Sequence, residues 1–272
     1  MIDWLQALVL GIVQGATEYL PVSSSGHLVI AQHLFGFEDP ALFFDIVLHL
    51  GTLVAVIWYY RKDLLTLVSE TLEGLRSLAS GHSWEEALRS YPGFRFALLI
   101  VVGTVPTAVI GITFEDSFER LFGSVRLVGL MLILTGTVLL LTRLAPSGGR
   151  GAAEMRWLDA LVIGVVQGLA ITPGISRSGV TIAVALLLGI ERETAARYSF
   201  LLSIPSIVGA LLLRMGGAED GVGITALVVG FGAAAVTGYF CLVLLVRLVK
   251  KGRLSWFAPY CFALGLLALI FG

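Results

Sequence analysis

The sequence predicts an all-α polytopic membrane protein with six transmembrane helices and two re-entrant helical hairpins. Of the 272 residues, 57% are hydrophobic and only 14% are charged, whereas soluble domains average about 45–50% apolar and about 25% charged residues. The mean hydropathy is +0.93. Several apolar stretches reach the length of about 20 residues that a helix needs to cross the hydrocarbon core of a bilayer. The composition argues against a soluble or disordered chain. A net charge of -1 with scattered Lys and Arg argues against a nucleic-acid partner.

The predicted transmembrane helices share a long apolar core, and all but the first have no charge in that core. The first contains Asp45 and His49, one helical turn apart. We expect this pair to support a functional site or to satisfy each other. The predicted spans cover about 43–60, 96–112, 127–142, 197–214, 222–246 and 254–272.

Two other apolar regions are interrupted by polar residues and indicate re-entrant hairpins. The first, about 4–37, breaks at Glu18 and the following PVSSSGH, and the second, about 158–190, breaks at TPGISRSG. The second arm of each is only about ten residues long, which reaches roughly half of the hydrocarbon core. Polar backbone at that depth needs protein or a water-filled cavity around it. We therefore expect the two loops to be buried together.

The two hairpins resemble each other in sequence. The GIVQG of residues 11–15 aligns with GVVQG of 164–168, and SSSG of 23–26 aligns with SRSG of 176–179, both at the same separation of 153 positions. A constant separation over such a stretch indicates an internal duplication. The chain is predicted to be one membrane domain of two repeats, 1–152 and 153–272, each with a hairpin followed by three spans.

The distribution of Lys and Arg predicts the orientation in the membrane. The basic segments 61–95, 143–156, 192–197 and 247–253 fall on one side if neither hairpin crosses, and the first 42 residues contain no Lys or Arg. Both termini are therefore predicted outside, with 61–95 as a long cytoplasmic loop. Because three spans separate the hairpins, they enter from opposite sides. The repeats are then inverted, and the loop tips meet near the midplane, an arrangement that commonly builds a site for a polar substrate.

Ionisable residues at membrane depth are candidates for function because burying them is costly. Gln14 and Glu18 share one helix face and could hold Mg²⁺ or Ca²⁺ through oxygen, or could simply be a stabilising polar pair. Arg177 could be a phosphate clamp or a structural partner of Glu18, and both roles could hold in turn.

The serine-rich breaks are the second group of candidates. Ser23-Ser24-Ser25-Gly26-His27 opens the second arm of the first hairpin, and free N–H groups at a helix start suit phosphate. Ser24 and His27 are three residues apart and could form a nucleophile and its base. The alternatives are N-capping by the serines and a buried, hydrogen-bonded imidazole.

At these residues the sequence resembles the undecaprenyl-diphosphate phosphatase family, also known as bacitracin-resistance proteins. Residues 14–27, QGATEYLPVSSSGH, are similar to the family's (E/Q)xxxE and PVSSSGH segments, and residues 173–181, PGISRSGVT, to its PGxSRSxxT segment. The likeness continues through residues 48–52 and 198–205 and covers essentially the whole chain.

The resemblance implies a bacterial inner-membrane, multi-pass enzyme that removes the terminal phosphate of undecaprenyl diphosphate, recycling the carrier lipid for peptidoglycan synthesis and conferring bacitracin resistance. It also implies Mg²⁺ or Ca²⁺ as cofactor, a site open to the outer face, and metal ligation by Glu18 and Gln14. Many relatives carry a carboxylate where this chain has Gln14, so Glu18 must fill any carboxylate role alone. By position, the catalytic residues are Glu18, Ser24, His27 and Arg177, and the substrate-binding residues are Ser23, Ser25, Gly26, Ser176, Ser178 and Thr181.

Several alternatives remain open at this stage. Attack by Ser24 with help from His27 competes with attack by metal-activated water with His27 as base. A transporter or flippase for a lipid phosphate or another anion would use the same features. The small residues between Gly230 and Gly238 suit a helix interface within one chain or in a homodimer.

Overall fold

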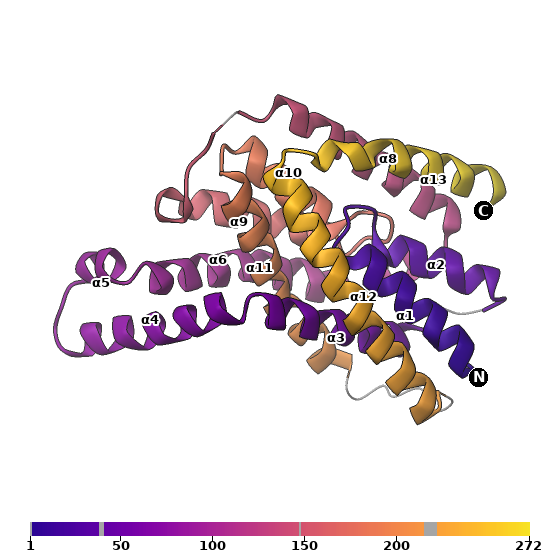
Figure 1. The fold of residues 1–272 in the computed structure, drawn as a ribbon, viewed down its shortest axis with the longest axis horizontal. Coiled ribbons are helices and arrows are strands. Elements are labelled where there is room, and N and C mark those ends of the chain that lie inside the picture. The colour runs from indigo at the N-terminus through magenta and orange to yellow at the C-terminus, as the bar shows by residue number, and fades with distance from the viewer. Residues whose placement is uncertain (1, 38–40, 147, 215–221) are drawn as a thin grey trace.

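The computed structural model describes residues 2–37, 41–146, 148–214 and 222–272. Across these ranges the chain is helical apart from short connections, and the pairing of extended backbone is limited to one isolated bridge between Arg150 and Ile190. The predicted all-α class is confirmed. The helices (Figure 1) are α1 (Trp4–Glu18), α2 (Ser24–Leu34), α3 (Leu42–Tyr59), α4 (Arg61–Ala79), α5 (Trp84–Ser90), α6 (Pro92–Thr113), α7 (Glu115–Phe122), α8 (Val125–Leu141), α9 (Trp157–Leu169), α10 (Arg177–Leu187), α11 (Arg192–Arg214), α12 (Ile224–Lys250) and α13 (Ala258–Phe271).

Six helices correspond to the predicted spans. Within the described ranges, α6, α8, α11 and α12, and α13 with the short turn before it, are each long and apolar enough to cross a bilayer. The sixth is α3, which meets that test together with α4, from which it is bent by 75°. The protein is therefore a multi-pass membrane protein.

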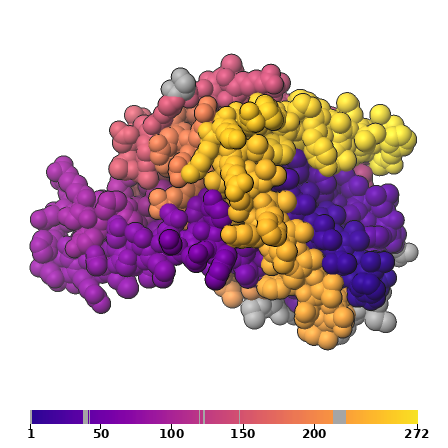
Figure 2. All heavy atoms as spheres, viewed as in Figure 1, coloured from indigo at the N-terminus to yellow at the C-terminus, as the bar shows by residue number. Residues whose placement is uncertain are grey.

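The hydrophilic segment after α3 differs from the expected loop. Residues 61–95 form α4, α5 and the start of α6, which together make a lobe at the end of the molecule opposite the start of α1 and the end of α13 (Figures 1 and 2). Gly74 of α4 lies against the ring of Phe94 on α6, where an added Cβ would come within 2.6 Å of it. This contact packs α4 against the start of α6. The high charge content of the segment had indicated a loop instead. Residues 115–122, also expected between spans, form α7.

Each re-entrant region is a pair of short helices separated by a non-helical break. Ser23 caps α2 by accepting a hydrogen bond from the N–H of Gly26, and Ser176 caps α10 by accepting one from the N–H of Gly179, both at 3.2 Å. The capping role that the sequence left open for these serines is thus present in both hairpins.

The two breaks touch each other, as predicted. A Cβ built on Gly26 would lie 3.2 Å from Cα of Gly174, and one built on Gly179 would lie 3.0 Å from Cβ of Pro21. Gly174 has φ +94°, a conformation that favours glycine, and an added Cβ would also come within 2.5 Å of a carbonyl oxygen on α8. The chain therefore needs glycine where the two loops meet.

The first arm of each hairpin packs on a long helix of the other half of the chain. A Cβ on Gly11 of α1 would lie 2.4 Å from the carbonyl oxygen of Gly230 on α12, and one on Gly164 of α9 would lie 2.1 Å from that of Gly103 on α6. These matched contacts support the predicted duplication, whose boundaries at 1–152 and 153–272 stay a prediction. They also show that α12 uses its small residues within the chain.

We predict that Gly164→Ala lowers the free energy of unfolding by about 1–3 kcal/mol, because its Cβ must displace the backbone of α6. Gly232→Ala on α12 is the matched control, since nothing lies within 4 Å of its added Cβ. The measurement is unfolding by titrated denaturing detergent, followed by circular dichroism. Equal midpoints for the two variants would show that the α9–α6 contact is looser than described.

Candidate active site

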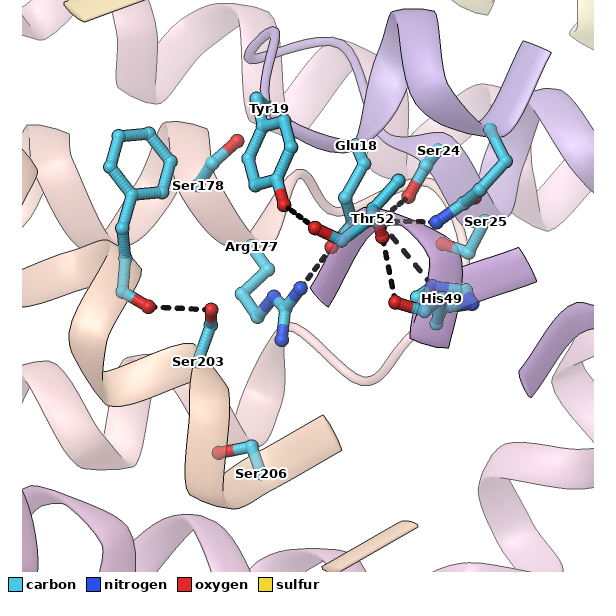
Figure 3. A network of polar contacts seen from close by, with 12 residues as sticks. Glu18, Tyr19, Ser24, Ser25, His49, Thr52, Arg177, Ser178, Ser203 and Ser206 are labelled. Carbon is cyan, nitrogen blue, oxygen red and sulfur yellow. Dashed lines mark hydrogen bonds and ion pairs between the residues drawn. The ribbon is translucent and has the colours of Figure 1, made fainter. Parts of the chain in front are cut away.

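Glu18 is the centre of the buried polar site. It is the last residue of α1, and its side chain is only 3% exposed. One carboxylate oxygen, Oε1, forms an ion pair with Nη2 of Arg177. The other, Oε2, accepts hydrogen bonds from the hydroxyl of Ser24 at 2.6 Å and from the amide of Gln14 at 2.8 Å (Figure 3). A carboxylate at a helix C-terminus is electrostatically unfavourable, so these partners are what hold the charge there.

His49 of α3 reaches the same carboxylate. Its Nε2 lies 3.4 Å from Oε2 of Glu18 (Figure 3). Its Nδ1 lies 2.7 Å from the backbone carbonyl oxygen of Asp45. A carbonyl oxygen only accepts, so Nδ1 carries a proton and donates. The role of His49 is therefore larger than the supporting one expected from the sequence, because it contacts Glu18 directly.

Arg177 approaches from the second hairpin and joins the two halves of the chain at the site. It is the first residue of α10, just as Ser24 is the first residue of α2. The N-termini of both short helices therefore meet at Glu18, and the first N–H groups of a helix have no partner within it. Together with the guanidinium, they make an environment suited to a phosphate group.

A cavity of about 550 Å³ extends from this site. Its polar wall includes Glu18, Ser24, Ser25, His49, Ser176 and Arg177. Apolar side chains form much of the remainder, and the cavity reaches Glu115 and Phe118 on α7. A charged recess that continues into a mostly apolar cavity fits a molecule with an anionic head and a hydrocarbon tail.

The side chains of His27 and Ser24 form no hydrogen bond with each other in the described structure. Nε2 of His27 is 2.7 Å from the hydroxyl of Tyr260 on α13, its ring stacks on that tyrosine, and its Nδ1 is 2.8 Å from the carbonyl oxygen of Ser23. His27 is therefore a hydrogen-bonded imidazole, which was the second interpretation of this residue from the sequence. The hydroxyl of Ser24 pairs with Glu18 and not, as expected, with His27. The spacing of three residues is helical, but Ser24 turns toward α1 while His27 faces α13.

The predicted substrate-binding residues divide into two groups. Ser25 and Ser176 line the cavity. Thr181 is fully buried and is hydrogen-bonded to the carbonyl oxygen of Arg177 at 2.7 Å and to the hydroxyl of Ser199 at 2.5 Å. Ser178 lies 3.4 Å from the hydroxyl of Ser176. Ser23, Gly26, Ser178 and Thr181 shape the hairpins in this structure, and contact of any of the six with substrate stays a prediction.

The sequence reasoning missed a second polar cluster in the same cavity. Gln167 donates a hydrogen bond to the hydroxyl of Ser206 at 2.8 Å and lies 3.3 Å from that of Thr107, and all three line the cavity. The internal repeat could have indicated Gln167, because this residue aligns with Gln14 at the separation of 153 positions.

The side chains at the site offer a hard divalent cation few protein oxygens. Oε1 of Gln14 is buried and has no hydrogen-bond partner within the described residues, and the carboxylate of Glu18 is adjacent. The described residues contain no cluster of three or more His, Cys, Asp or Glu that could form a closed cage. Mg²⁺ is commonly held by one or two protein oxygens together with substrate phosphates. Gln14 and Glu18 are therefore suited to a cation shared with a bound phosphate.

The fold and the site define an integral membrane protein with a buried polar cavity where two opposed re-entrant hairpins meet. Residues 7–267 match the family model described as bacitracin resistance protein BacA, and the chain belongs to that family. The chain is 51% identical to an undecaprenyl-diphosphatase of Desulfosudis oleivorans, with 98% of both chains covered. It is 46% identical to one of Desulforapulum autotrophicum, again over 98% of both, and 44% identical to one of Carboxydothermus hydrogenoformans, over 97% of this chain and 96% of the relative. The resemblance seen in the motifs is confirmed.

We predict that Arg177→Met lowers the free energy of unfolding by about 3–5 kcal/mol, because it leaves Glu18 as an unpaired buried carboxylate. Adding Glu18→Gln to the same chain should recover most of the loss. Unfolding in detergent by titrated denaturant measures both.

Arg89→Met is the control for this ion pair. Arg89 pairs with Glu85 at 2.8 Å, but both side chains are more than three-quarters exposed, so its loss should leave the unfolding midpoint unchanged. A similar small effect for Arg89→Met and Arg177→Met would contradict the central role of the buried pair.

Proposed function

We infer that this chain is a membrane phosphatase that hydrolyses undecaprenyl diphosphate to undecaprenyl phosphate and inorganic phosphate. One observation carries the inference: Ser24 donates to the buried carboxylate of Glu18 beside Arg177, where two helix N-termini meet in a cavity with an apolar extension. The relatives named undecaprenyl-diphosphatase match 98% of the chain. Family membership favours this activity over transport of a lipid phosphate, and the corresponding role is carrier-lipid recycling with resistance to bacitracin.

Binding depends on an exchange of partners at Arg177. The guanidinium pairs with Glu18 in the structure, and an incoming diphosphate offers oxygens to the same fork. The N–H groups at the starts of α2 and α10 hold the remaining oxygens. A positive guanidinium and two helix N-termini then stabilise the negative charge on phosphorus where it develops. A divalent cation held by Gln14 and Glu18, Mg²⁺ or Ca²⁺, would neutralise further phosphate charge when bound.

The chemical step that this geometry favours is attack by Ser24. As its Oγ forms a bond to the terminal phosphorus, the bond from phosphorus to the bridging oxygen breaks, and the electron pair leaves with undecaprenyl phosphate. The hydroxyl proton passes to Glu18, whose Oε2 lies 2.6 Å away. Water then forms a bond to phosphorus while the bond from phosphorus to Oγ of Ser24 breaks. Glu18 returns its proton to Oγ, and the other product is inorganic phosphate, which carries both protons of the water. Glu18 takes the role of base that the sequence suggested for His27. The rival route is direct attack by water with Glu18 or His49 as base.

The charge distribution and the topology support a proposal for the orientation. We place the protein in the bacterial inner membrane with both termini outside. The cavity reaches α7, which follows the end of α6 away from the α4–α5 lobe. The site would then open toward the outer face. Homodimer formation also stays a prediction.

We predict that the purified protein in detergent releases phosphate from undecaprenyl diphosphate, and that Ser24→Ala and Arg177→Ala each lower kcat by at least about 100-fold. Arg89→Ala should keep full activity. No phosphate release by the wild type in detergent, where no two compartments exist, would favour a transporter.

The nucleophile can be tested by trapping. Acid quenching during turnover of substrate labelled in the terminal phosphate should leave label on Ser24, and Ser24→Ala should lose it. Near-full turnover by Ser24→Ala would transfer the role to water.

We predict that chelation of divalent cations abolishes phosphate release and that added Mg²⁺ or Ca²⁺ restores it. Gln14→Glu supplies a second carboxylate and should lower the cation concentration needed for half-maximal activity, because a charged oxygen is a stronger ligand for a hard cation than an amide oxygen. If chelation leaves the activity unchanged, the proposal that Gln14 and Glu18 hold a divalent cation needed for phosphate release is wrong.

A further inference from the structure

Ser23, which directly precedes Ser24, has an unusual backbone conformation. Among the described residues it alone combines a side chain with a positive φ, at φ +67° and ψ +95°. This region is disfavoured for any residue with a Cβ, and such residues persist only where their surroundings hold them. Because Ser24 begins α2 at the next position, the direction of its hydroxyl depends on the backbone of Ser23.

The side chain of His27 holds the carbonyl group of Ser23. Its Nδ1 lies 2.8 Å from that carbonyl oxygen, which also accepts the backbone N–H of His27 at 3.1 Å. A carbonyl oxygen only accepts, so Nδ1 carries a proton and donates. In the neutral ring, Nε2 is then an acceptor. Both hydrogen bonds join the first turn of α2 to the residue with the positive φ.

Two neighbouring residues of α13 complete the attachment. The hydroxyl of Tyr260 lies 2.7 Å from Nε2 of His27 and donates to it in the neutral ring, and the two rings are parallel within 3°. Cys261 is fully buried, and its thiol donates to the carbonyl oxygen of Pro21 at 3.4 Å. Helix α13 therefore holds the break of the first hairpin at Pro21 and, through His27, at Ser23.

Helix α13 is itself fixed against α8, beside which it lies (Figure 1). A Cβ built on Gly265 of α13 would come within 2.7 Å of the carbonyl oxygen of Gly129 on α8. Helix α8 in turn holds the break of the second hairpin. Its Thr135 donates to the carbonyl oxygen of Gly174 at 3.0 Å and accepts the N–H of Ser176 at 3.1 Å. These two packed helices thus hold the breaks of both hairpins.

The attachment lies outside the cavity that Ser24 lines. Neither His27 nor Tyr260 is among the described residues of the cavity wall. The hydroxyl of Tyr260 therefore reaches the site only through other residues. It fixes the imidazole of His27, and the imidazole fixes the backbone from which Ser24 donates to Glu18.

We propose that Tyr260 is a positioning residue for phosphoryl transfer. It acts through His27 to hold Ser23 in its disfavoured conformation, and so to hold the hydroxyl of Ser24 against Glu18. This role rests on the proposed function, in which Ser24 is the nucleophile. It gives His27 a task other than proton transfer, since both ring nitrogens are engaged away from Ser24. A small displacement of a nucleophile slows the chemical step steeply.

Nuclear magnetic resonance tests the contact without turnover. In protein labelled with 15N at histidine, the His27 signals, identified by their loss in His27→Gln, should show a proton on Nδ1 and none on Nε2. Tyr260→Phe keeps the stacked ring and removes only the hydroxyl, so it should move the Nε2 resonance of His27. Tyr239→Phe on α12, whose ring packs against Tyr59, is the matched control and should not move it. A proton on Nε2, or an Nε2 resonance that Tyr260→Phe leaves unchanged, would overturn the proposal.

The consequence for catalysis is measured with substrate labelled in the terminal phosphate. Tyr260→Phe should lower kcat, and the rate at which label appears on Ser24, by about 10-fold or more, with KM within about twofold of the wild-type value. Tyr239→Phe should leave all three unchanged. Circular dichroism and size-exclusion profiles that match the wild type confirm that both variants are folded.

The same measurement separates two kinds of failure. Label that appears on Ser24 at the wild-type rate in Tyr260→Phe, or a raised KM with unchanged kcat, would contradict the positioning role and leave the phosphatase activity intact. Wild-type protein that releases phosphate but never carries label on Ser24 would contradict the proposed nucleophile, and the role of Tyr260 would fall with it.

Discussion

The ion pair between Glu18 and Arg177 is the interaction on which the site depends. Neither charge is tolerable alone at this depth, since Glu18 is almost fully enclosed and Arg177 has a side chain only 22% exposed. Each comes from the break of a different hairpin, so satisfying one requires the presence of the other. The pair therefore holds the two loops together while it keeps a guanidinium ready for an anion. Stability and binding capacity rest on the same contact.

Close backbone approach makes that contact geometrically feasible. Gly11 and Gly164 let the first arms of the hairpins lie directly on α12 and α6, and Gly174 lets the second loop turn beneath α8. With helices this close, van der Waals contact and short polar bonds replace the hydrophobic driving force that lipid cannot supply between spans. The hairpins are consequently fixed in position although neither crosses the bilayer.

Much of this arrangement was predictable because hydropathy, charge distribution and internal repetition each constrain a different feature. Hydropathy predicted the spans, and the repeat, with three spans between its two hairpins, predicted that Arg177 lies near Glu18. Side-chain direction was not predictable in the same way. The spacing of Ser24 and His27 permitted contact, but packing against α1 and α13 turned them apart. His49 was underrated because its nearness to Glu18 depends on how α3 packs on α1. The helical lobe was not predicted, because the high average charge of residues 61–95 does not reveal that α4 packs one side, at Gly74, against α6.

The exchange of packing partners between the halves has a consequence for biosynthesis. Helix α1 leaves the ribosome first, yet the surface that accommodates its glycines belongs to α12, which begins at Ile224. Until that late segment is inserted, α1 can contact α2 and α3 but lacks the helix on which its glycine face packs. Helix α1 therefore gains its final packing partner only after most of the chain has been synthesised. A ribosome that stalls before α12 would leave a fragment in which the glycine face of α1 lacks the helix that covers it.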